Sequence, residues 1–148
     1  MVKEDTDAAP AETCNCLAMR QAARQITQMY DVALAAVGLR ATQYSVLNRL
    51  DRLGPSCVQD LADALVLDRS TLGHNLRPLE RDGFVRLATE RGDRRTRRLE
   101  LTASGKAKLD AARPLWRAAQ ARFEASYGKA DAKDLRTALR RVVETVGQ

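Results

Sequence analysis

The sequence predicts a mainly α-helical fold with one small β-hairpin, arranged as a winged helix-turn-helix between long N- and C-terminal helices. Two short amphipathic helix patterns lie about three residues apart, with residues 66–68 between them. Two short apolar runs follow, at 84–87 and 99–101, and enclose an arginine-rich segment with a glycine turn, which is typical of a hairpin. Longer helical patterns stand on both sides of this central region.

The N-terminal part predicts a disordered segment and two helices. Residues 1–11 are polar, and we expect them to be disordered. Apolar or small side chains recur every three or four positions over 12–37, which predicts a long helix closed by Gly38. A second helix is expected at 42–53, where Gly54 and Pro55 end it.

The next two helices form the helix-turn-helix candidate. Ser56 and Gln59 have the spacing of a capping box, which predicts Ser56 as the N-cap of a short helix. Asp68 is predicted to cap the following helix, at 69–82, which ends at Gly83.

Two further helices are expected after the hairpin. Thr102 can cap a long helix that reaches Tyr127, with a kink at Pro114. Gly128 ends it, and Asp131 begins the last helix. That helix carries a single apolar stripe: Leu135, Leu139, Val142, Val143 and Val146.

The basic charge is concentrated in one region. Lys and Arg outnumber Asp and Glu by 25 to 19, and 20 of the 25 are Arg. Residues 1–12 hold one Lys against four acidic residues, a net charge of −3, whereas residues 69–98 hold nine Arg against four acidic residues, a net charge of +5. Such crowding of like charges is unfavourable, and a polyanion would relieve it. Nucleic acid is therefore the first partner to consider.

The predicted helix at 69–82 has one apolar and one polar face. At about 100° per residue, Leu72, Leu76 and Leu79 share the side that must enter the core. The opposite side can contact phosphates and base edges in a major groove, and Arg77 is the best candidate for a bidentate contact to guanine. The residues of this helix that we assign to the DNA interface are Arg69, Ser70, Thr71, His74, Arg77 and Arg81. A merely solvated face is the alternative, but the neighbouring hairpin favours DNA contact.

The hairpin tip at 91–98 contains five arginines within eight residues. All five are assigned to the DNA interface: Arg91, Arg94, Arg95, Arg97 and Arg98. Gly92 allows a tight turn, and Asp93 supports the tip because it can pair with Arg97 across the loop. An arginine here fits a narrow minor groove, where the negative potential is enhanced. The alternative is an exposed solubilising loop.

On these residues, the sequence resembles the MarR family of transcriptional regulators over residues 14–147. The strongest matches are Asp68-Arg69-Ser70-Thr71-Leu72, Leu79-Glu80-Arg81-Asp82-Gly83-Phe84-Val85, and Asp93-Arg94-Arg95 followed by Leu99-Glu100-Leu101-Thr102-Ala103-Ser104-Gly105. The resemblance implies that Arg95 enters the minor groove with Asp93 as its supporting acid. It also implies a homodimer on a pseudo-palindromic operator, which mostly represses nearby genes until a small molecule or an oxidant releases it.

The expected organisation is one compact domain in four segments. These are a disordered N-terminal segment (1–11), an N-terminal dimerisation helix (12–38), a winged helix-turn-helix DNA-binding region (39–102) and C-terminal dimerisation helices (103–148). The terminal helices carry more apolar surface than the central module can cover, so we expect a two-fold homodimer.

The resemblance also implies an effector pocket between the DNA-binding module and the terminal helices. Its expected ligand is an aromatic or anionic small molecule. The residues that could line it are Arg20, Arg24, Arg113 and Trp116. A position in the dimer core is the alternative for Trp116.

Cys14 and Cys16 offer a second possible trigger. They stand at the head of the first predicted helix, and helix N-termini favour thiolates. This placement resembles the organic-hydroperoxide-sensing branch of the family, and Tyr30 resembles one of its tyrosine partners, although Arg20 stands where another tyrosine is expected. Structural or incidental thiols are the alternative. Cys57 is expected in the core.

Other classes of function have less support. No signal-peptide-like stretch and no run of about 18 apolar residues is present, so we expect a cytoplasmic protein with no membrane partner. One histidine and a C-x-C pair are too few for a metal site, and no cofactor is expected. No phosphate loop or nucleophile–base pair indicates an enzyme. An architectural DNA-binding protein without an effector is the remaining alternative.

Overall fold

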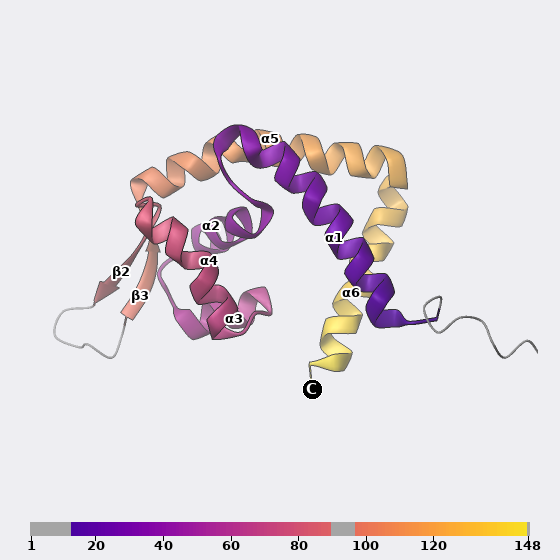
Figure 1. Cartoon of the computed structure of the whole chain (residues 1–148), viewed down its shortest axis with the longest axis horizontal. Helices are drawn as coiled ribbons and strands as arrows, with labels where there is room; N and C mark the ends of the chain where they lie inside the picture. Colours follow the sequence, from indigo (N-terminus) through magenta and orange to yellow (C-terminus); the bar gives the residue numbers. More distant parts are fainter. Residues whose placement is uncertain (1–12, 90–96, 148) are drawn as a thin grey trace, which may run out of the picture.

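The computed structural model describes residues 13–89 and 97–147, and it confirms the mainly α-helical fold with a small antiparallel sheet. Its helices are α1 (Asn15–Leu34), the 3-10 turn η1 (Ala35–Val37), α2 (Ala41–Leu53), α3 (Val58–Leu65), α4 (Arg69–Arg81), α5 (Ala103–Tyr127) and α6 (Lys129–Val146). Its strands are β1 (Ser56–Cys57), β2 (Val85–Thr89) and β3 (Arg97–Leu101). In Figure 1, α5 extends across the molecule, with α2–α4 and the hairpin gathered at its first half and α6 at its far end.

The sheet has one more strand than the predicted hairpin. The strand order is β1-β3-β2, and β1 joins β3 through the pairs Ser56↔Leu99 and Cys57↔Arg98. The capping box at Ser56 is therefore wrong: its hydroxyl donates to the Gly54 carbonyl oxygen (2.8 Å), and Cys57 is the N-cap of α3. Pairing with β3 holds Ser56 in an extended conformation, which moves the helix start one residue along the chain.

The start of the last helix also differs from the prediction. α6 begins at Lys129, not at Asp131, because the chain leaves the helical conformation only at Gly128 (φ +106°). α5 runs as one helix through Pro114 to Tyr127. The predicted caps at Asp68 and Thr102 are confirmed: their side chains accept hydrogen bonds from the backbone N–H groups of Thr71 (2.6 Å) and Gly105 (3.0 Å).

The core lies between α2, α3, α4, the sheet and the first half of α5. The predicted apolar face of α4 is confirmed, since Leu72, Leu76 and Leu79 are all buried. They pack in one cluster with residues of every neighbouring element, including Leu47, Leu50, Leu61, Val85, Leu99 and Leu109. Burial of this kind fixes which side of α4 faces solvent.

The terminal helices leave apolar side chains uncovered. Val32 on α1 is 68% exposed, and Leu139, Val143 and Val146 on α6 are 44%, 48% and 77% exposed. The predicted apolar stripe of α6 is thus largely uncovered in a single chain. Within the described ranges, no helix is both long enough and apolar enough to cross a membrane.

Candidate nucleic-acid interface

The turn between α3 and α4 presents α4 at the molecular surface. α3 ends at Val66, which adopts the left-handed conformation (φ 55°), an unusual one for a β-branched residue. Asp68 then caps α4 through the backbone N–H and the hydroxyl of Thr71, at 2.6 Å and 2.9 Å. These hydrogen bonds hold the pKa of the Asp68 carboxyl below its usual value. The cap therefore anchors the N-terminal turn of the helix that we assign to the DNA interface.

The assigned side chains of α4 all lie at the surface, and they are Arg69, Ser70, Thr71, His74, Arg77 and Arg81. Two of them have partners within the protein: the Thr71 hydroxyl serves the Asp68 cap, and Arg81 Nε lies 3.3 Å from Asp82 Oδ1. The latter pair is well exposed, so water and salt screen it and DNA phosphates can compete for Arg81.

The hairpin of β2 and β3, here called the wing, follows α4 directly. Its strands pair from Val85↔Leu101 to Thr89↔Arg97, and Arg86 makes a 3.0 Å ion pair with Glu100 across them. The side chains of Arg97 and Arg98, the first two residues of β3, are exposed. The other predicted tip residues lie outside the described residues: Arg91, Gly92, Asp93, Arg94 and Arg95.

Thr102 connects the wing to α4, a role that the sequence interpretation missed. Its hydroxyl donates to the Gly83 carbonyl oxygen (2.6 Å), and its backbone N–H donates to Phe84 O (3.1 Å). The same hydroxyl oxygen accepts from Gly105 N at the start of α5. One side chain therefore fixes the end of α4, the base of the wing and the first turn of α5. The sequence signal was visible only as a helix cap.

The four predicted effector residues make different contacts within the chain. Trp116 stacks between Tyr30 of α1 (ring centroids 6.4 Å apart) and Tyr44 of α2 (5.9 Å). Burial is the main cause that raises the pKa of both tyrosines. Arg113 turns instead to α2, where its guanidinium lies 2.5 Å from an Asp51 carboxylate oxygen. Trp116 is thus part of an aromatic cluster within one chain.

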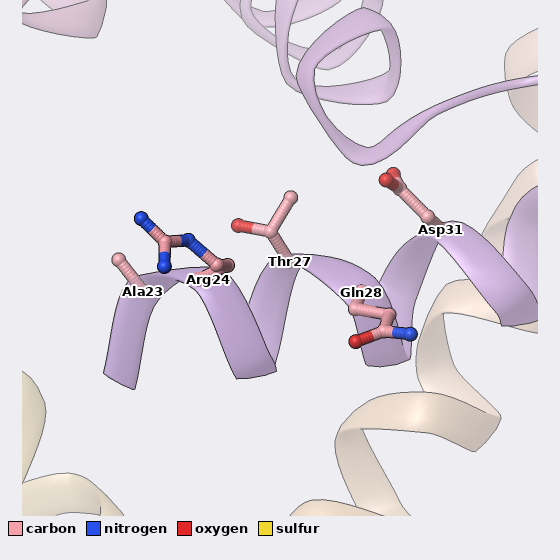
Figure 2. Close-up of a pocket in the computed structure, with 5 residues that line it drawn as sticks. All are labelled: Ala23, Arg24, Thr27, Gln28 and Asp31. Carbon is pink, nitrogen blue, oxygen red and sulfur yellow. The ribbon is translucent and has the colours of Figure 1, made fainter. Parts of the chain in front are cut away.

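Trp116 is not among the residues that line the hollow beside Arg24. Arg24 lines this open hollow of about 500 Å³ along α1, together with Ala23, Thr27, Gln28 and Asp31. Figure 2 shows Arg24, Thr27 and Asp31 projecting from the same side of the helix. Asp31 Oδ1 accepts a hydrogen bond from Ala41 N at the start of α2 (2.7 Å). Arg20 is exposed on α1 and is not among the residues that line this hollow.

The cysteines occupy helix starts. Cys14 is the N-cap of α1, where its sulfur accepts from Leu17 N (3.4 Å), and both Cys14 and Cys16 are exposed. Cys57 was predicted in the core, but it is partly exposed and its sulfur accepts from Asp60 N (3.4 Å). The strand pairing of β1 places it at the rim of the sheet. Among residues 13–89 and 97–147, no three His, Cys, Asp or Glu side chains are grouped to hold a metal ion.

Comparison with known proteins finds transcriptional regulators. Residues 39–96 match the model of the MarR family. The transcriptional activatory protein BadR of Rhodopseudomonas palustris is 33% identical over 127 residues, covering 82% of this chain and 69% of BadR. The HTH-type transcriptional repressor NicR of Pseudomonas putida is 32% identical over 96 residues, covering 65% of this chain and 61% of NicR.

A solved structure extends this similarity to nearly the whole chain. The M. tuberculosis transcriptional regulator MosR, crystallised in complex with DNA, is 40% identical with a TM-score of 0.81. The match covers 90% of this chain and 96% of that one. The similarity therefore includes α1, α5 and α6 as well as the helix-turn-helix.

Proposed function

We propose that this chain, which belongs to the MarR family of transcriptional regulators, is a homodimeric repressor that a small aromatic or anionic compound releases from a pseudo-palindromic operator. The observation that carries the proposal is the outward polar face of α4. Three buried leucines on the opposite side of α4 fix this orientation, and the arginine-rich wing follows the helix directly in the chain. MosR, the 40% identical relative, was crystallised with DNA.

α4 and the wing have shapes that suit the major and the minor groove of DNA. A major groove about 12 Å wide admits a helix, so Ser70, His74 and Arg77 on α4 would meet base edges there. The wing would reach the adjacent minor groove with Arg95, while Arg97 and Arg98 neutralise phosphates. Phosphate contacts supply affinity, and the base contacts of α4 supply the choice of sequence.

The uncovered apolar side chains of the terminal helices support the homodimer. A second copy would bury Val32 of α1 and the stripe of α6 that includes Val143 and Val146. Two-fold symmetry would then set the two α4 helices about 34–36 Å apart, one turn of DNA, and require an operator of matching symmetry.

Two features near α1 support an effector. The hollow at Arg24 offers a cation and a hydroxyl to an anionic compound, and the partly exposed rings of Tyr30 and Trp116 offer aromatic surface. Both lie beside the junction of α1 with α2, so a ligand there would act on the placement of the DNA-binding helices. NicR is named a repressor and BadR an activatory protein. Expression of a reporter gene placed behind the operator distinguishes repression from activation by this protein.

The test is binding to the DNA upstream of the protein's own gene. Footprinting should give a symmetric protected site, and gel shifts with random competitor DNA should show specificity of about a thousandfold or more. A ratio close to one would refute the proposal and favour an architectural DNA-binding protein. Aromatic acids should release the complex at concentrations that leave the fold intact.

Thiol sensing is the second candidate, and the exposure of both Cys14 and Cys16 at the head of α1 favours it. Peroxide should then release the operator complex of the wild-type protein but not of a Cys16→Ser variant. A Cys14→Ser variant serves as the matched control. Equal release from all three proteins would exclude Cys16 as the sensor.

A further inference from the structure

α2 and α5 pack against each other, and this contact, here called the seam, joins the DNA-binding elements to the terminal helices. α2 packs against α3, α4 and β3, whereas α5 continues away from them towards α6 (Figure 1). The orientation of α4 relative to the far end of α5 therefore depends on how α2 sits on α5, in addition to the Thr102 contacts that join the end of α4 to the start of α5. At one end of the seam, Tyr44 of α2 stacks on Trp116 of α5. At the other end, the contact is ionic.

Asp51 is the centre of the ionic end. Its Oδ2 atom contacts two cations of α5, Arg113 Nη2 at 2.5 Å and Lys106 Nζ at 3.2 Å. Arg113 also donates to Asn48 Oδ1, one turn earlier on α2 (3.4 Å). The side chains of Asp51 and Arg113 are only 24% and 25% exposed, so this pair is less screened than the surface pairs of the wing.

Asp110 belongs to the same group of charges but joins nothing across the seam. It contacts Lys106 (3.2 Å) and Arg113 (3.5 Å) from within α5, and its side chain is 53% exposed. Hydrogen bonds to Asp51 and Asp110 raise the pKa of the Lys106 ammonium. Asp51 thus differs from Asp110 in one respect that matters here: its carboxylate lies on the other helix.

A charge-assisted hydrogen bond is directional, whereas apolar packing is not. The buried leucines and the aromatic stack hold α2 against α5, but they resist a small rotation or slide less than paired charges do. We propose that Asp51 is a positioning residue that fixes the orientation of α2 on α5 and thereby the separation of the two α4 helices in the dimer. This inference rests on the proposed homodimer and its two-half-site operator.

The consequence is a preference for one half-site spacing. One base pair advances a half-site by about 3.4 Å and rotates it by about 35° around the DNA axis, so a changed spacing requires α4 both to shift and to rotate. With Asp51 in place, the dimer should bind tightly only to operators with the native half-site spacing. A seam without that carboxylate should accept neighbouring spacings at a reduced affinity for the native one, because the reading helices are no longer held in place before binding.

The experiment measures binding to operators with half-sites at the native spacing and one or two base pairs closer or farther, and to a duplex with a single half-site. The variants are Asp51→Asn, the matched control Asp110→Asn, and the conservative Asp51→Glu. Asp51→Asn should lose about tenfold on the native operator, the size of one poorly engaged base pair, and bind the other spacings almost equally well. Asp110→Asn should behave as the wild type, Asp51→Glu should recover part of the preference, and single half-site affinity should stay unchanged.

Three outcomes would overturn the inference. Asp51→Asn could keep the wild-type spacing preference, it could lose half-site and full-operator binding equally, or Asp110→Asn could have the same effect. Arg113→Lys, which keeps the charge but loses the guanidinium geometry, tests the same point should Asp51→Asn fold poorly. If the wild-type protein bound all half-site spacings with the same affinity, the proposed dimer on a two-half-site operator would be refuted, and so would the role of Asp51.

Discussion

Replacing Gly105 with alanine should destabilise the protein, although Gly105 lies in the first turns of an α-helix where alanine is ordinarily favoured. A β-carbon at this position would lie 2.0 Å from the Phe84 carbonyl oxygen and 2.8 Å from Leu101 Cδ1. The nearest atom belongs to the backbone, so it cannot turn aside as a flexible side chain could. The start of α5 must therefore move away from the base of the wing.

The magnitude follows from three contributions. Overpacking of a filled site costs about 1–3 kcal/mol. Displacing α5 also weakens the two hydrogen bonds of Thr102, to Phe84 O and to Gly83 O, each worth about 0.5–1.5 kcal/mol. The helix propensity of alanine offsets about 1 kcal/mol. The net loss is about 3 kcal/mol, which for a chain of this size lowers Tm by about 6–12 °C.

Gly73→Ala is the matched control. Gly73 is also inside a helix, but a β-carbon there meets nothing within 4 Å, so this change should stabilise the protein by up to about 1 kcal/mol. Urea unfolding of both variants, followed by circular dichroism at one protein concentration, gives the comparison, because the stability of a dimer depends on concentration. A Gly105→Ala variant as stable as the wild type would refute the close approach of α5 to the wing.

Four further predictions test the interface, the cap and the dimer. Arg77→Ala should weaken operator binding by about 1–3 kcal/mol and relax specificity at one base position, as measured by gel shifts with a panel of point-substituted operators. Arg95→Ala should weaken binding and flatten the dependence of log K on log salt concentration; an unchanged affinity would contradict the proposed role of the wing. Val143→Asp should shift the protein to monomer in size-exclusion chromatography, since the exposed stripe of α6 would then carry a charge. Because the pKa of Asp68 is lowered in the folded state, its cap should stabilise the protein above the ordinary Asp pKa of 3.8 and lose this effect as pH falls through the lowered value, so the stability difference between wild type and Asp68→Asn should shrink in acid.

Local chemistry determined much of α4, the helix that we propose to read DNA, in advance. The carboxylate of Asp68 and the flexible Gly83 mark the two ends of α4, and the spacing of Leu72, Leu76 and Leu79 shows which side is buried. The outward position of Arg77 follows from these three leucines alone. Helix caps and apolar spacing depend on residues a few positions apart, so the sequence alone is enough to recognise them.

Contacts between distant segments could not be read in this way. The two residues of β1 are too few to show a strand period, and only pairing with β3 makes Ser56 extended and leaves the α3 cap to Cys57. Likewise, only the packing of α5 on α2 places Arg113 beside Asp51. Arg113 and Trp116 meet α2 through different partners, Asp51 and Tyr44, and Arg24 lines a hollow along α1, because helix rotation and packing decide which side chains converge.

The sequence by itself determined the class of the fold, the bounds and outward charges of α4, and the hairpin strands β2 and β3, because propensity, capping and charge are properties of neighbouring residues. Only the tertiary structure decided that Thr102 joins the wing to α4, that Gly105 must be small, and that Asp51 links α2 to α5. Those contacts span from about twenty to more than sixty positions and exist only once the core has brought the segments together.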